Sequence, residues 1–175
     1  MAENRNFDVD LQIDDLDKKI LSLIMENARM PFLEVARACG VSGAAIHQRV
    51  QRLVNIGVIK GSEFIINPSK IGYMTCAYIG IFLKDASYFD SVVDQMKKIP
   101  QIVECHYTTG QYAIFIKVYA KSNEHMKFIL HDCLQQIEGI SATETIISLE
   151  ESFKRQISID DKIKDLSEKP SIAMD

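Results

Sequence analysis

The sequence has no long apolar run and no start typical of an exported protein. No stretch of about 18 apolar residues is present, so we expect no membrane span. The opening MAENRNFDVD is polar and acidic instead of basic and then apolar, and it therefore does not resemble a signal peptide. We expect a cytoplasmic protein without a membrane partner.

Cysteines are few and scattered. The four thiols are those of Cys39, Cys76, Cys105 and Cys133. They show no CxxC spacing, which favours reduced thiols in helix and strand cores over a disulfide framework or a zinc site. His106 follows Cys105 along a predicted strand, and such neighbours point to opposite faces. His131 and Cys133 are two apart on a predicted helix and also diverge. We expect no metal and no cofactor.

The sequence motifs of common enzyme active sites are also absent. The sequence contains no Gly-rich phosphate loop, no nucleophile–base signature and no cluster of carboxylates. We therefore expect that the protein is not an enzyme. A small metabolic enzyme built on the C-terminal half is the alternative, and turnover of a substrate would support it.

Acidic residues outnumber basic residues over the whole chain, but one segment has the opposite balance. The net charge of −4 argues weakly against nucleic-acid binding. From Arg29 to Lys60, however, five basic residues accompany a single acid, Glu34. This segment is net positive and is the candidate for DNA contact.

Helical periodicity dominates the first third of the chain. Asp14, with Asp17 three positions later, resembles a capping box, and apolar residues at helical spacing follow. A second short helix is predicted to end at Gly40, and a third to begin at the N-cap Ser42. Two short helices joined by a tight turn form a helix-turn-helix, whose second helix enters the major groove of DNA.

A small β-wing is predicted after the third helix. The string VIKGSEFIINP reads as two short β-segments bent at Gly61 and ended at Asn67-Pro68. The prediction for residues 1–66 is therefore a winged helix-turn-helix domain, all-α apart from the small β-wing and linker.

Beyond Pro68 the pattern changes to that of strands. Four segments rich in β-branched and aromatic residues are predicted as strands: 73–83, 102–109, 113–119 and 142–149. A helix that starts after Ser87, with Asp90 three positions on, separates the first two. Another, from Ser122 to about Glu138, separates the last two.

The order βαββαβ is that of the ferredoxin-like fold, a four-stranded antiparallel sheet with both helices on one face. We predict this domain over residues 67–151 and a polar tail over residues 152–175, which makes the chain an α+β protein of two domains. The bare face of such a sheet is often covered by a second chain, because its apolar side chains would otherwise meet water. A homodimer is expected.

The outer face of the third helix is small and polar. Gln can bond adenine bidentately, His can bond guanine, and small residues let the helix approach the bases. Arg49 and Arg52 lie farther along and suit phosphates, and Arg29 suits a phosphate or an ion pair. A plain solvated face is the alternative, but residues 35–60 contain no acid. The candidate DNA-binding residues are Arg29, Ser42, Gly43, Ala44, His47, Gln48, Arg49, Gln51 and Arg52.

Longer strings carry a family resemblance. IDDLDKKILSLIMENAR, LEVARACGVSGAAIHQRVQRLVNIGVIKG and NPSKIG resemble the N-terminal half of the Lrp/AsnC (leucine-responsive, feast/famine) family, and VECHYTTGQYAIFIKVYA and EGISATETIISLEE resemble its effector and assembly domain. The resemblance runs from about Ile13 to Glu151. It implies a sequence-specific transcriptional regulator that forms dimers, often tetramers or octamers, and senses a small metabolite. An architectural protein that wraps DNA without an effector is the alternative.

The resemblance places the effector beside the loop between the second and third strands of the C-terminal domain. The family usually has Gly-Asp-Tyr-Asp or Gly-Asp-Phe-Asp there, whereas this chain has Gly110-Gln111-Tyr112-Ala113. A carboxylate pairs with a ligand ammonium more strongly than a neutral amide does, so we expect weak binding of leucine or asparagine. The candidate effector residues are Tyr107, Thr108, Gly110, Gln111, Tyr112, Ala113 and Gln135.

Overall fold

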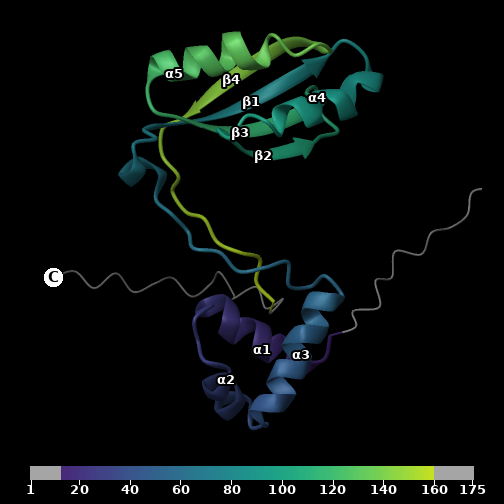
Figure 1. Cartoon of the computed structure of the whole chain (residues 1–175), viewed down its shortest axis with the longest axis vertical. Coiled ribbons are helices and arrows are strands. Elements are labelled where there is room, and N and C mark those ends of the chain that lie inside the picture. Colours follow the sequence, from purple (N-terminus) through teal and green to yellow (C-terminus); the bar gives the residue numbers. More distant parts are fainter. Residues whose placement is uncertain (1–12, 160–175) are drawn as a thin grey trace, which may run out of the picture. The chain divides into compact units, whose positions relative to one another are not determined.

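The computed structural model describes residues 13–159, and these form two compact units (Figure 1). The first contains the described residues up to Phe64 together with those from Arg155 onward, and the second is Ile65–Lys154. Within the described residues no helix has the length and apolar character needed to cross a membrane.

The first unit is built from three helices, α1 (Asp15–Glu26), α2 (Phe32–Cys39) and α3 (Gly43–Asn55). Their apolar faces meet in a small core in which Ile20, Val35 and Ile46 have no exposed surface. The predicted capping box starts α1: the Asp17 amide donates to Asp14 Oδ1 at 2.8 Å, and the Asp14 amide donates to Asp17 Oδ2 at 3.1 Å.

The turn between α2 and α3 has the predicted geometry. Gly40 ends α2 with a φ of 72°, a left-handed conformation that favours glycine, and the Val41 amide donates to the Ala36 carbonyl at 3.1 Å. Ser42 caps α3, because its Oγ accepts a hydrogen bond from the Ala45 amide at 3.2 Å. The helix-turn-helix prediction is confirmed.

The prediction of two short β-segments in the wing is wrong. Residues 58–67 contain no strand, although all of them are described. The Ile59 amide donates back to the Leu53 carbonyl at 3.1 Å, which holds the start of the segment against the end of α3. Phe64 and Ile65 are 73% and 87% exposed. A two-stranded hairpin without a core to cover is marginal in water, so the β-propensity of this string is not enough to form it.

The second unit contains a four-stranded antiparallel sheet in the order β2-β3-β1-β4. Its strands are β1 (Thr75–Leu83), β2 (Ile102–Tyr107), β3 (Ile114–Ala120) and β4 (Ile140–Ser148). The helices α4 (Phe89–Met96) and α5 (Asn123–Phe128) pack on the same side of the sheet, because apolar residues of both belong to one core with Ile79 and Ile116 (Figure 1). The βαββαβ prediction is confirmed.

Two local features of the helices in this unit differ from prediction. The side chain that caps the entry to α4 is Asp85 instead of Ser87: Asp85 Oδ1 accepts from the Ser87 amide at 2.9 Å and opens a 3-10 turn over Ala86–Tyr88. The helix predicted to run to Glu138 changes to a π-helix at Ile129–Leu134. The wider turn brings Leu134, which has no exposed surface, into the core where a regular helix would place Cys133.

The sheet face opposite the helices is rich in aromatic side chains. Tyr78 and Phe115 alternate with core residues along β1 and β3, so they point away from the helices. Their rings stack at 5.9 Å between centroids. Lys117, only 5% exposed, lies on the same face and is paired with Glu151 at 3.0 Å and Glu104 at 3.8 Å. This open face thus combines apolar rings with one paired cation.

Candidate DNA interface and effector site

The helix α3 presents the predicted base-reading residues to solvent. Ile46 and Leu53 have no exposed surface and anchor its inner side. Gly43 is half-buried, and the capping residue Ser42 is exposed. The remaining candidates on the outer face are exposed: Ala44, His47, Gln48 and Gln51. The arrangement matches a recognition helix whose first two turns meet base edges.

Neighbours restrain two of these side chains. The His47 ring meets the edge of Phe32 on α2 at 5.8 Å between centroids. The Gln51 amide donates to Asn55 Oδ1 at 3.0 Å, one turn farther along α3. Gln48 lies between these positions and is exposed. It is therefore the strongest candidate for reading a base.

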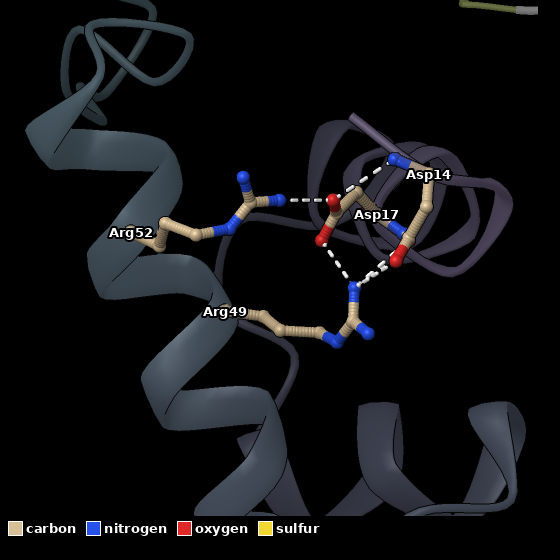
Figure 2. Close-up of polar contacts among 4 residues, drawn as sticks. All are labelled: Asp14, Asp17, Arg49 and Arg52. Carbon is tan, nitrogen blue, oxygen red and sulfur yellow. Dashed lines mark hydrogen bonds and ion pairs between the residues drawn. The ribbon is translucent and has the colours of Figure 1, made fainter. Parts of the chain in front are cut away.

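Arg49 and Arg52 extend from α3 toward the start of α1 (Figure 2). One nitrogen of Arg49, Nη1, donates to Asp14 Oδ2 at 2.7 Å and to Asp17 Oδ1 at 2.9 Å, and Arg52 Nη2 donates to Asp17 Oδ2. The Asp17 side chain has no exposed surface. The hydrogen bond from Arg49 is the main reason that the pKa of Asp14 lies below its ordinary value.

We call these four residues the α1–α3 ion cluster. Two carboxylates balance two guanidinium groups, so the cluster carries no net charge. Arg49 and Arg52 were predicted as phosphate contacts, and the structure gives them an intramolecular role that the sequence prediction did not include. Asp14 and Asp17 were recognised only as a cap, because nothing in the local pattern connects them with α3.

Arg29 precedes α2 and is exposed. Its guanidinium carbon lies 4.4 Å from the centroid of the Phe64 ring, a cation–π contact within the first unit. A guanidinium in this position keeps its charge and its donors, so the contact is compatible with a phosphate role. Arg37 and Lys60 are the other exposed basic residues of the segment.

The predicted effector loop borders an open cavity of about 220 Å³ in the second unit. The cavity is lined by Phe82, Leu83, Ala86, Phe89, Tyr107, Gln111 and Ala113. Three of these, Tyr107, Gln111 and Ala113, were predicted as effector residues. The lining is apolar and aromatic except for the Gln111 amide and the Tyr107 hydroxyl. A cavity with such a lining suits an uncharged group of a ligand.

Thr108 holds the loop in shape. Its Oγ1 donates to the Tyr112 carbonyl at 2.5 Å, and its amide donates to the Ala113 carbonyl at 3.2 Å. The Ala113 amide in turn donates to the Ile81 carbonyl at 3.0 Å, which ties the loop to β1. Gly110 is exposed at the turn. Thr108 and Gly110 therefore shape the loop, and neither of them lines the cavity.

Tyr112 turns away from the cavity and packs on β1. Its ring lies flat over Gly80, where an added Cβ would be 2.4 Å from Cδ1 of the tyrosine. The hydroxyl donates to Glu144 Oε2 at 2.7 Å. Glu144 was not among the predicted site residues. Gln135, which follows the π-helix, is exposed and is not part of the cavity lining.

Comparison with known proteins identifies both units. Residues 13–54 match the AsnC-type helix-turn-helix domain, and residues 76–157 match the Lrp/AsnC ligand binding domain. The chain belongs to the Lrp/AsnC family. Lrp/AsnC proteins are transcription regulators with a DNA-binding helix-turn-helix and an effector-binding domain, so the family prediction from the sequence is confirmed.

Individual Lrp/AsnC relatives extend the match over most of the chain. The regulatory protein AsnC of Haemophilus influenzae is 40% identical over 145 residues, which cover 83% of this chain and 97% of the relative. The structure of Escherichia coli AsnC has a TM-score of 0.79 at 38% identity and covers 83% of this chain and 98% of that one. A feast or famine regulatory protein from Mycobacterium tuberculosis, complexed with L-methionine, has a TM-score of 0.77 at 25% identity over 83% of this chain and 98% of its own.

Proposed function

We propose that this Lrp/AsnC regulator recognises a specific DNA sequence through α3, assembles through the open face of its sheet, and binds a small-molecule effector at the loop 110–113. The observation that carries the DNA proposal is the outer face of α3, which is exposed, uncharged and able to form hydrogen bonds. Base edges in the major groove are read by such groups.

The α1–α3 ion cluster favours sequence reading over non-specific wrapping. Binding that depends on phosphates alone needs free positive charge, and its affinity falls steeply with salt. Arg49 and Arg52, two of the five basic residues between Arg29 and Lys60, are already balanced by Asp14 and Asp17. The phosphate contribution is thereby reduced, and discrimination by hydrogen bonds at the bases becomes more important.

Replacing Gln48 with alanine tests the base-reading assignment. The variant should lose about 1 to 3 kcal/mol of affinity for the preferred duplex and should discriminate less at one base position. Fluorescence anisotropy with the preferred duplex and with single-base variants of it measures both effects. Gln51→Ala should cost less affinity than Gln48→Ala, because the Gln51 amide is already bonded to Asn55. If Gln48→Ala weakens preferred and scrambled duplexes equally, Gln48 does not read a base.

Assembly is proposed from the open face, where a second copy would cover the Tyr78 and Phe115 rings. The native chain should be at least a dimer at micromolar concentration. Phe115→Asp places a charge among these rings and should shift the protein to monomers in sedimentation equilibrium. Phe128→Asp is the control, since Phe128 is 53% exposed on α5, which packs on the other side of the sheet. A monomeric native chain, or a dimeric Phe115→Asp variant, contradicts the assembly.

The effector proposal is supported by the cavity beside the loop and by the L-methionine complex of the Mycobacterium tuberculosis relative. An apolar side chain suits the walls formed by Phe82, Leu83 and Phe89. The polar end of an amino acid would then need partners near Gln111.

A further inference from the structure

Phe64 is an exposed aromatic residue that contacts a cation of the same unit. It is 73% exposed, so its ring does not fill the core of the first unit. The guanidinium carbon of Arg29 lies 4.4 Å from the centroid of this ring. Arg29 belongs to the turn between α1 and α2, whereas Phe64 lies in the segment that follows α3. The contact therefore joins that segment to the turn before α2.

The backbone of Arg29 is held by the turn, while its side chain keeps its donors. The Arg29 amide donates to Asn27 Oδ1 at 3.0 Å, and the Met30 amide donates to the Asn27 carbonyl at 3.0 Å. An aromatic ring meets a guanidinium group through its face, so Phe64 uses none of the five N–H donors of Arg29. Among the described residues no carboxylate pairs with this guanidinium group. Its donors are available to a ligand with several acceptor oxygens.

The turn that carries Arg29 lies close to the outer face of α3. Phe32, three residues after Arg29, meets the His47 ring at 5.8 Å between centroids. Three residues of extended chain span at most about 11 Å, and the major groove is about 12 Å wide. A phosphate at the border of a groove that α3 enters is therefore within reach of Arg29. Arg49 and Arg52 differ, because their charges are balanced by carboxylates.

We propose that Phe64 is a positioning residue, which holds Arg29 ready to bind a phosphate of the DNA backbone. This inference rests on the proposed DNA recognition and adds to it a residue outside the helix-turn-helix. A long arginine side chain loses rotamer freedom when it binds a ligand, and this loss weakens the complex. The Phe64 ring restricts Arg29 before DNA arrives. Part of the loss therefore does not occur on binding, and the affinity for DNA is higher.

A double-mutant cycle on DNA affinity tests the inference. Phe64→Leu removes the ring but keeps an apolar side chain, and Arg29→Gln removes the cation. Fluorescence anisotropy at several salt concentrations measures the affinity of each variant for the preferred duplex and for a scrambled one. We expect Phe64→Leu to weaken both duplexes about two- to fivefold, as for an exposed cation–π contact. Arg29→Gln should weaken both further and reduce the salt slope by about one unit, because phosphate contacts carry no sequence information.

Three further chains make the result specific to the pair. In the Arg29→Gln chain, adding Phe64→Leu should have no further effect, since the side chain that Phe64 positions is gone. Phe64→Trp keeps an aromatic face and should bind both duplexes as the native chain does. Ile65→Ala is the control for the segment: Ile65 is 87% exposed, and its removal should leave DNA affinity unchanged.

A contact that only ties the segment to the turn gives a different result. Phe64→Leu would then lower the midpoint of thermal unfolding without changing DNA affinity, and the inference would be wrong. An equal loss of affinity from Phe64→Leu with and without Arg29, or a Phe64→Trp chain as weak as Phe64→Leu, also overturns it. So does an Arg29→Gln chain with native affinity and salt slope. In these cases DNA recognition by α3 stands. If the native chain binds no duplex, the proposed DNA recognition itself fails, and the inference fails with it.

Discussion

Replacing both Arg49 and Arg52 with methionine should lower the free energy of unfolding of the N-terminal unit by about 3 to 5 kcal/mol. This is the cost of leaving one member of a buried ion pair without its partner. Asp17 is the reason, because its carboxylate has no exposed surface and receives hydrogen bonds from both arginines. Methionine retains much of the apolar side-chain stem, so the lost cations dominate the effect.

Thermal unfolding followed by circular dichroism measures this loss. Arg37→Met, on the exposed side of α2, is the control and should stay within about 0.5 kcal/mol of the native chain. Adding Asp17→Asn to the double variant removes the buried charge and should recover part of the stability. A double variant as stable as the Arg37 control would show that the α1–α3 ion cluster does not hold the helices together.

Gly80→Ala should have the largest effect in the C-terminal unit. The new Cβ would lie 2.4 to 2.6 Å from Cδ1, Cε1 and Cγ of Tyr112. Because Cγ is among these atoms, rotation of the ring about its own axis does not relieve the clash, and the whole side chain must leave. We expect a loss of about 1 to 3 kcal/mol from overpacking, together with displacement of the effector loop.

Chemical unfolding and effector titration of the same variant separate these consequences. Gly110→Ala is the matched control, since an added Cβ there meets nothing within 4 Å. The double variant Gly80→Ala, Tyr112→Ala should regain stability, because the clash is gone, but should lose effector affinity. A Gly80→Ala chain with native stability and native effector affinity would contradict the packing of Tyr112 described above.

Much of the fold follows from local signals. The capping box at Asp14, the left-handed Gly40 and the cap at Ser42 are determined by residues within a few positions of each other. Enrichment in β-branched and aromatic residues likewise predicted the four strands. The strands predicted for the wing do not form. Phe64 and Ile65 are exposed and have no core to pack against, and high β-propensity alone is not enough for strands to pair.

The candidate sites depend more on distant contacts. The outward face of α3 was predictable from helical periodicity. The pairing of Asp17 with Arg49 spans 32 residues, and so does that of Tyr112 with Glu144. No short pattern contains both partners of such a pair. Arg49 and Arg52 therefore looked like phosphate ligands, and Glu144 was missed.

The proposed reading of DNA sequence by α3 can be tested directly. Duplexes enriched from a random pool by the native protein should be titrated against scrambled duplexes of equal length at physiological salt. If α3 reads the bases, the protein should prefer the enriched sequence by at least about a thousandfold, as is typical of specific regulators. Equal affinity for both duplexes, with the same dependence on salt, would contradict it and would favour an architectural protein that binds the phosphate backbone.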